Sequence, residues 1–104
     1  MITHNVYIPP VAPKTPTLSV DPTDASIVSG RRVTLTCLTL STGTVTYTFW
    51  KGVQQIAQSN DRTYTFNSVS TADTGSYKCS ATIGTRVSRD SADINLNVIG
   101  LFYS

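Results

Sequence analysis

One short motif and a distant cysteine constrain the fold of this chain more than any other feature. The motif is Asp73-Thr74-Gly75-Ser76-Tyr77-Lys78-Cys79, and the chain's only other cysteine is Cys37. Tyr77 and Cys79 are two residues apart, so in an extended strand both side chains point to the same face. The motif therefore predicts a sharp corner that leads into a strand with one buried face.

Alternating apolar and polar residues predict about seven short strands around this motif. Val33, Leu35 and Cys37 face one way, for example, while the residues between them face the other. Turn-forming residues separate such runs at short intervals, the pattern of an antiparallel β-sandwich. The expected strands lie near 18–20, resuming at 27–28 after a kink, then near 33–37, 45–51, 54–58, 64–66, 77–83 and 92–98. The last should be very regular, with Ala92, Ile94, Leu96 and Val98 inward, and 84–90 should be a loop.

Composition and length support one all-β domain. Glu is absent, Ser and Thr are abundant and charged residues make up 13%, a balance that favours strands over helices. A chain of 104 residues has room for one hydrophobic core. We expect a proline-rich extended linker at 1–16, the domain at 17–99 and a tail at 100–104.

The ends of the chain indicate a fragment of a larger protein. The N-terminus lacks the basic and then apolar pattern of a signal peptide, and no apolar run is long enough to span a membrane. Met1 is therefore interpreted as a start placed on an excised domain or as part of a longer chain. Any membrane attachment would come through a tether outside this fragment.

Several classes of function are disfavoured by the residue inventory. The net charge is only +2 and the Lys and Arg are scattered, so no basic stripe for nucleic acid is expected. The only histidine, His4, lies in the predicted linker, so a catalytic serine or cysteine has no placed base. The two cysteines have no neighbouring ligand for a metal, and the six Asp are dispersed. We therefore predict no enzyme, cofactor or metal site.

The chain resembles an immunoglobulin-superfamily domain. The matching features are Cys37 in the second strand, an aromatic residue in the third, Tyr64 and Phe66 before the corner, and Asp73-x-Gly75-x-Tyr77-x-Cys79. The resemblance covers Thr17 to Val98. The interval from Phe49 to Asp73 leaves room for one extra strand, as in the C2 or I set. The first half of the domain is most similar in sequence to Fc-receptor-like and sialic-acid-receptor-like domains. The similar segments are Leu18-Ser19-Val20-Asp21-Pro22, Gly30 and Val33-Thr34-Leu35-Thr36-Cys37.

The resemblance implies roles for the residues of the motif. Cys37 and Cys79 would form a disulfide between the two sheets, worth about 4 kcal/mol in the chain-entropy model. The Tyr77 hydroxyl would bond to backbone just upstream, as in a tyrosine corner. Gly75 would permit a tight approach at the corner, and Asp73 would accept hydrogen bonds from backbone donors there.

The third strand departs from the family pattern at its aromatic residue. The family normally has a core tryptophan there, but this chain reads Phe49-Trp50-Lys51. If Trp50 faced inward, Thr46 and Thr48 would have to face inward with it, which is a poor filling for a core. We therefore predict Phe49 in the core and Trp50 outside. Packing of Trp50 against the disulfide would refute this.

Three surface patches are candidates for protein binding. The first is an outer sheet face with Thr48, Trp50, Lys78, Ser80, Asn95 and Asn97, where Trp50 would be the anchor unless the neighbouring strand covers it. The second is the 84–90 loop with Arg86 and Arg89, which could also be a plain solvated hairpin. The third is Arg31-Arg32 beside Arg62, which ordinary turn-flanking charges explain as well. The chain has no Asn-x-Ser or Asn-x-Thr sequon.

The resemblance implies a non-catalytic, extracellular or cell-surface module of an adhesion or immune-type receptor. Its partner would be a protein ligand or a second copy, and paired cysteines suit an oxidising compartment. Two alternatives stay open: a structural I-set spacer of an intracellular filament protein, and a viral or phage surface decoration domain.

Overall fold

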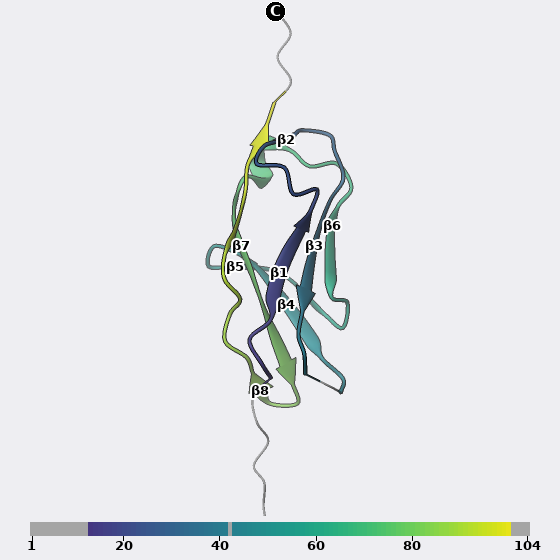
Figure 1. Cartoon of the computed structure of the whole chain (residues 1–104), viewed down its shortest axis with the longest axis vertical. Coiled ribbons are helices and arrows are strands. Elements are labelled where there is room, and N and C mark those ends of the chain that lie inside the picture. The colour runs from purple at the N-terminus through teal and green to yellow at the C-terminus, as the bar shows by residue number, and fades with distance from the viewer. Residues whose placement is uncertain (1–12, 42, 101–104) are drawn as a thin grey trace, which may run out of the picture.

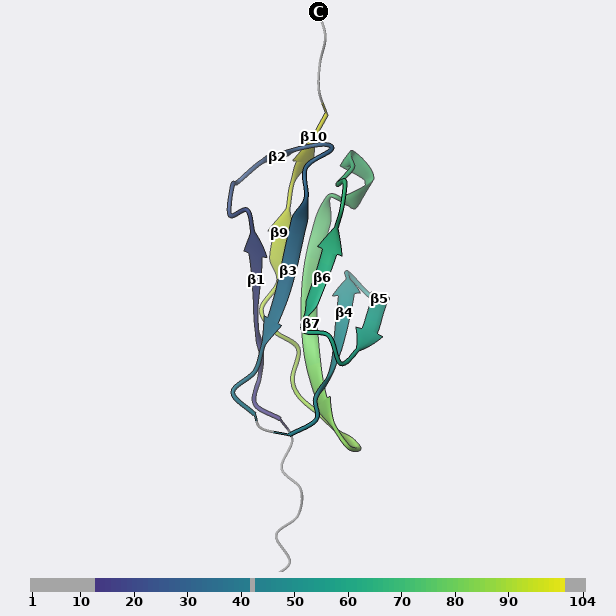
Figure 2. The same cartoon turned by 90° about the vertical axis from the view of Figure 1, so that its right-hand side faces the viewer.

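Two β-sheets pack face to face in the computed structural model, which describes residues 13–41 and 43–100 (Figures 1 and 2). The first sheet has the order β1 (Thr17–Asp21), β3 (Val33–Leu38) and β6 (Thr63–Phe66). The second has the order β5 (Gln54–Ser59), β4 (Thr46–Lys51), β7 (Gly75–Ile83) and β8 (Arg86–Val87), and β9 (Ile94–Leu96) also pairs with β7. β2 (Ile27–Val28) pairs in parallel with β10 (Val98–Ile99). This confirms the predicted antiparallel β-sandwich.

Helical structure in the described residues is limited to one turn of 3₁₀ helix, η1 (Thr71–Asp73). It lies directly before β7, where the sequence predicts the corner. No helix in residues 13–41 or 43–100 has the length and apolarity needed to cross a bilayer.

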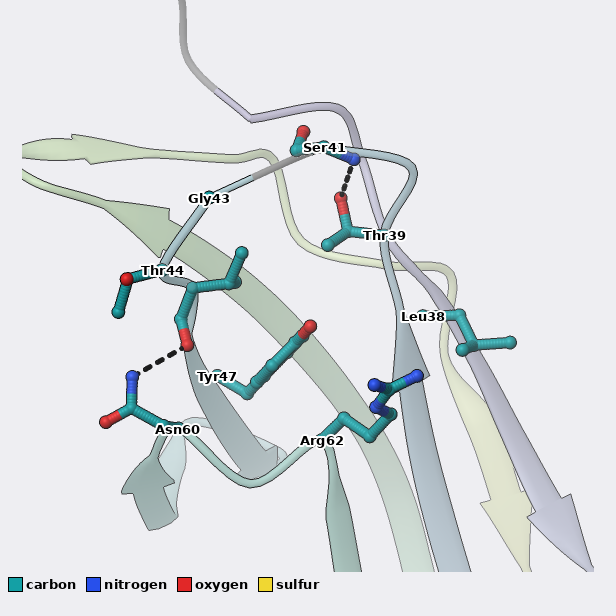
Figure 3. A pocket seen from close by; sticks show the side chains of 9 residues that line it. Leu38, Thr39, Ser41, Gly43, Thr44, Tyr47, Asn60 and Arg62 are labelled. Carbon is teal, nitrogen blue, oxygen red and sulfur yellow. Dashed lines mark hydrogen bonds between the residues drawn. The ribbon is translucent and has the colours of Figure 1, made fainter.

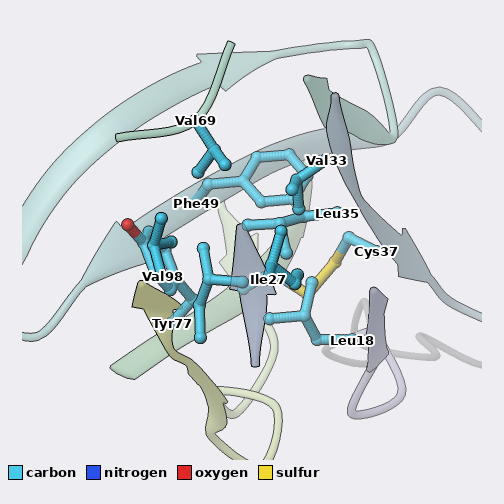
Figure 4. Close-up of a cluster of buried hydrophobic side chains, with 11 residues drawn as sticks. Leu18, Ile27, Val33, Leu35, Cys37, Phe49, Val69, Tyr77 and Val98 are labelled. Atoms are coloured by element: carbon cyan, nitrogen blue, oxygen red, sulfur yellow. A yellow bond between two sulfur atoms is a disulfide. The ribbon is translucent and has the colours of Figure 1, made fainter. Parts of the chain in front are cut away.

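The core lies between the two sheets, as the period-two pattern predicts (Figure 4). Val33, Leu35 and Cys37 on β3 are completely buried, while the threonines between them are only half-buried. From the other sheet β7 contributes Tyr77 and Cys79. A strand that alternates in this way buries one face and leaves the other to solvent.

The predicted disulfide joins the sheets between Cys37 on β3 and Cys79 on β7 (Figure 4). The two Cα atoms are 6.1 Å apart, and both residues have no exposed surface. The bridge therefore ties the centre of one sheet to the centre of the other.

Aromatic side chains continue the core away from the bridge. Phe49 on β4 has its ring centroid 5.9 Å from Tyr64, Tyr64 lies 5.0 Å from Phe66, and Phe66 lies 5.8 Å from Tyr77. The last two contacts are edge-to-face, the geometry that the ring quadrupole favours. The row links β6 of the first sheet to β4 and β7 of the second by side-chain packing.

The corner before β7 is held by both backbone and side-chain bonds. The Tyr77 hydroxyl donates to the carbonyl of Asp73, and the Asp73 Oδ2 accepts from the Ser70 backbone N–H at 2.8 Å. Burial raises the pKa of Tyr77 to about 12, with further contributions from the charges of Asp73 and Tyr64. The absence of a side chain at Gly75 leaves room for the side chain of Lys51, because a Cβ at position 75 would stand only 2.9 Å from the Lys51 Cε.

The last part of the chain differs from the predicted regular strand. Ala92 is exposed instead of inward, and pairing is confined to β9 and β10 with a break between them. Upstream, the side chains of Ser88 and Ser91 accept hydrogen bonds from the Ala81 and Cys79 backbone N–H groups, both at 2.9 Å. Hydroxyl groups thus take the place of strand carbonyls as acceptors next to β7, and Arg89 and Asp90 between them are exposed. The predicted 84–90 loop also contains β8, which pairs with β7 as a short hairpin.

The predicted linker and tail fall largely on residues 1–12 and 101–104, which lie outside the described residues. Where the chain enters the domain, Pro13 and Pro16 are buried, and the Lys14 backbone N–H donates to Ser41 Oγ at 2.9 Å. Residues 13–16 therefore contact the β3–β4 connection. The division of the chain at residues 16 and 99 stays a prediction.

Candidate protein-binding surface

The outer face of β5, β4 and β7 carries the candidate anchor, Trp50. In the register of the sheet Trp50 lies between Gln55 on β5 and Lys78 on β7. One row further along, Thr48 lies between Gln58 and Ser80. We call the residues Trp50, Gln55, Gln58 and Lys78 the Trp50 face.

A β-bulge gives this face its composition. Phe49 pairs with Ala57 whereas Trp50 pairs with Gln55, so Ile56 is an extra residue on β5. Both Ile56 and Ala57 pack against the core. Two successive inward side chains are possible only because the bulge interrupts the alternation. Gln55 and Gln58 consequently share the outer face with Trp50.

Phe49 and Trp50 take opposite sides of the sheet. Phe49 is 2% exposed and belongs to the core cluster, in register with Cys79. Trp50 is half-buried, opposite Lys78. The Trp50 Nε1 is covered by other atoms but has no hydrogen-bond partner, the one such buried side-chain nitrogen or oxygen among the described residues. A buried donor without a partner is rare in folded proteins.

The charge on this face is locally balanced. The Lys78 ammonium lies 3.0 Å from the Asp90 carboxylate, and both side chains keep some solvent exposure. Asp90 lies between Ser88 and Ser91, whose hydroxyl groups accept hydrogen bonds from the backbone of β7. The face around Trp50 therefore presents amides, an indole and one neutralised ion pair.

Ser80 is not a surface residue, contrary to the expectation for it. Ser80 and its neighbour Thr48 are both 3% exposed. Gln58 contributes to this burial, because its Nε2 donates to Thr48 Oγ1 at 3.1 Å. Small side chains beside a long glutamine are covered even on the outer face of a sheet.

The remaining predicted contact residues do not all meet Trp50. Asn95 is exposed and pairs with Ser76 further along β7. Asn97 instead bonds to Ser26 Oγ at 3.0 Å, so it belongs to the opposite edge of the molecule. Arg86 is exposed on β8, where it pairs with Ile83 at the end of β7, and Arg89 is exposed beside Asp90.

The predicted basic spot of Arg31, Arg32 and Arg62 does not form. Arg31 and Arg32 precede β3, and the Arg31 guanidinium lies 3.6 Å from Asp24. Arg62 lies at the opposite end of β3, where its carbonyl accepts from the Cys37 N–H at 2.8 Å. The sequence could not show this because the two segments meet only through strand pairing.

Gln55 and Gln58 are the surface residues that sequence reasoning missed. The available signal was the run Gln54-Gln55-Ile56-Ala57-Gln58, in which three long amides surround two apolar residues. No cluster of three or more His, Cys, Asp or Glu in the described ranges could hold a metal ion. The groups that the Trp50 face presents are amides, an indole and one ion pair.

Solved structures of low sequence identity share this fold. The second Ig-C2 domain of human Fc-receptor like A has a TM-score of 0.68 and 21% identity, over 81% of this chain and 95% of that chain. A chain in the structure of a mouse coronavirus receptor-binding domain complexed with its murine receptor has a TM-score of 0.72 and 23% identity, over 85% and 46%. Sidekick-1 immunoglobulin domains 1–5 give 0.65 and 16%, over 82% and 18%. This chain thus spans less than half of the last two.

Sequence comparison gives the family. No curated protein sequence matches this chain. The profile of the family described as immunoglobulin domain matches residues 15–82, which include both cysteines and the corner motif. Since this match covers more than half of the chain, and the sandwich and its disulfide are present, the chain belongs to the immunoglobulin domain family.

Proposed function

We propose that this domain is an extracellular protein-binding module that acts without chemistry, and that it binds through the Trp50 face. The observation that carries the proposal is the position of Trp50, half-buried on an outer sheet face between Gln55 and Lys78. Trp is among the residues most enriched at the energetic centres of protein interfaces.

The surroundings of Trp50 fit such a centre. The indole is half-buried, so it has less side-chain freedom to lose on binding than a fully exposed side chain. Gln55 is exposed, and its amide can both donate and accept hydrogen bonds. The Lys78–Asp90 pair adds no net charge, so it favours neither an acidic nor a basic partner surface.

The compartment is inferred from the disulfide and the relatives. Disulfides persist in oxidising environments and are rare in the cytosol. Two of the similar structures are named for Fc-receptor-like and receptor proteins. We infer a cell-surface or secreted parent protein of adhesion or immune-receptor type, whose partner is a different protein or a second copy.

A binding screen followed by two variants tests the surface. The biotinylated domain, assembled on streptavidin, is passed over an array of purified ectodomains that includes the domain itself. For any partner found, W50A should weaken binding by at least roughly 30-fold, the effect of a hot-spot residue. Q55E should also weaken binding, since it places a charge beside the indole without disturbing the core.

A matched control separates this surface from the opposite sheet. Ser19 is exposed on β1, so S19E adds the same charge as Q55E to the other sheet. Binding that is lost in S19E but kept in W50A and Q55E would refute the Trp50 face.

A separate measurement tests the compartment. Free thiols trapped by alkylation in natively expressed protein would favour the intracellular spacer instead.

A further inference from the structure

An open cavity of about 580 Å³ lies at one end of the sandwich, between the β3–β4 connection and the turn that joins β5 to β6 (Figure 3). Its walls include Leu38 and Thr39 from one side, Asn60 and Arg62 from the other, and Tyr47 between them. This volume is within the range of small-ligand sites. The cavity is separate from the Trp50 face, because Tyr47 points to the inner side of β4.

Two polar side chains that line this cavity lack partners within the described part of the chain. Figure 3 shows the Tyr47 hydroxyl directed into the cavity and the Arg62 side chain extending from the β5–β6 turn toward the end of β3. The side-chain hydrogen bonds of the described residues include neither group, and the ion pairs there are Arg31–Asp24 and Lys78–Asp90. All six carboxylate side chains of the protein lie in the described ranges. Arg62 therefore forms no close ion pair with a side-chain carboxylate of the described residues.

The nearest carboxylate in sequence is already engaged elsewhere. Asp61 Oδ1 accepts from the backbone N–H of Thr63 at 2.9 Å and from its hydroxyl at 2.8 Å. These bonds hold the carboxylate against its own turn. The Asp61 side chain consequently does not form a close ion pair with Arg62.

The backbone around the cavity is fixed on both sides. The Asn60 Nδ2 donates to the Val45 carbonyl at 3.0 Å, and the Arg62 carbonyl accepts from Cys37, a residue of the disulfide. On the facing wall the Thr39 hydroxyl donates to the Lys14 carbonyl at 3.3 Å. The guanidinium and the phenol are thus presented from anchored positions.

We propose that this cavity binds the carboxylate of an Asp or Glu side chain from a protein partner. The planar fork of Arg62 matches a carboxylate, and Tyr47 can donate a further hydrogen bond to it. Arg62 is the one charged residue in the lining, which suits a single negative charge better than a phosphate. Val45 in the lining offers apolar surface to the methylene stem of the acidic side chain.

The test is a ¹H–¹⁵N NMR titration with acetyl-Gly-Glu-Gly-amide, and with acetyl-Gly-Gln-Gly-amide as its neutral match. The Glu peptide should shift the Arg62 Nε–H signal and the backbone amides around the cavity, with a Kd on the order of 1 mM. The Gln peptide should bind at least roughly tenfold more weakly, because it lacks the charge. Equal binding of the two peptides would overturn the proposal.

Variants locate the site and separate it from the Trp50 face. R62Q should abolish the Glu-specific shifts, Y47F should weaken them about fivefold for one lost hydrogen bond, and W50A should leave them unchanged. Arg32 is exposed at the other end of β3, so R32Q is the matched arginine control. Shifts that persist in R62Q, or that R32Q removes, would refute the site. Acetate that binds as tightly as the Glu peptide would refute recognition of a protein side chain.

Discussion

Phe49 lies directly opposite Cys79 in the β4–β7 ladder, and both side chains are buried in the core cluster that contains the disulfide. The next residue, Trp50, lies opposite Lys78 on the outer face. Successive residues of a strand point to opposite sides, so only one of the two aromatics can face the bridge. The phenyl ring takes that place here, and the larger indole is left for the surface.

This division predicts very different stabilities for two alanine variants. F49A removes a ring that is 2% exposed and should lower the free energy of unfolding by about 3–5 kcal/mol, the usual cost for a buried Phe. W50A should cost less than half as much, because Trp50 is only half-buried. Urea denaturation of both variants measures the difference. A larger loss for W50A than for F49A would reverse the assignment of inner and outer faces.

Removing the disulfide should cost about 4 kcal/mol of unfolding free energy in the C37A/C79A double variant. The cysteines are separated by 42 positions in sequence, and the entropy of closing a loop of that length gives this value. Denaturant unfolding of the variant and of the oxidised wild type measures the loss. A loss below about 1 kcal/mol would mean that the bridge constrains the unfolded chain very little.

The fold was predictable because its signals are local in sequence. Val33, Leu35 and Cys37 alternate strictly and are completely buried, and Tyr77 and Cys79 do the same on β7. The assignment of Phe49 to the core required only its shared face with Val45 and Tyr47. Alternation predicts burial well when a strand is regular and pairs on both sides, because neighbouring strands then impose the same period.

The candidate sites were less predictable because they depend on pairing between distant segments. The bulge at Ile56 turns Gln55 and Gln58 outward, and it follows from the β4–β5 register, which the sequence does not state. Arg62 lines the same cavity as Tyr47 only because the β5–β6 turn lies beside the end of β3. The regular strand predicted from Ala92 onward likewise fails at its start, where the Ser91 hydroxyl accepts from the Cys79 N–H and Ala92 is exposed.

The tyrosine corner predicts a loss of stability in alkali. Burial, together with the charges of Asp73 and Tyr64, raises the pKa of Tyr77 to about 12, against about 10 in an unfolded chain. The folded state therefore keeps the Tyr77 proton that the unfolded state releases between pH 10 and 12. The stability that this group contributes is complete below pH 10 and is lost as the pH rises toward 12.

The Y77F variant isolates this contribution. It loses the hydrogen bond to the Asp73 carbonyl and should be less stable at pH 7 by about 1 kcal/mol. Between pH 10 and 12 its unfolding free energy should fall less steeply than that of the wild type. Urea denaturation at several pH values measures both effects. Parallel curves for the two proteins across this range would contradict the raised pKa.

The turn beside the cavity predicts an acidic shift for Asp61. The pKa of this exposed carboxyl is lowered, first by the Thr63 backbone N–H and then by the Thr63 hydroxyl, with Arg62 adding a weaker effect in the same direction against slight desolvation. Because the pKa is lower in the folded state, the ionised carboxylate stabilises the protein at pH values above its unfolded pKa of about 3.9. This stabilisation is lost as the pH falls through the folded pKa. T63V, which keeps the β-branched shape but removes the hydroxyl, should move the NMR titration midpoint of Asp61 upward. T65V, on the same strand but bonded toward Thr34, is the control and should leave that midpoint in place. A midpoint that is unchanged in T63V would show that the Thr63 hydroxyl contributes little and that the backbone N–H of residue 63 alone holds the Asp61 carboxylate against its turn.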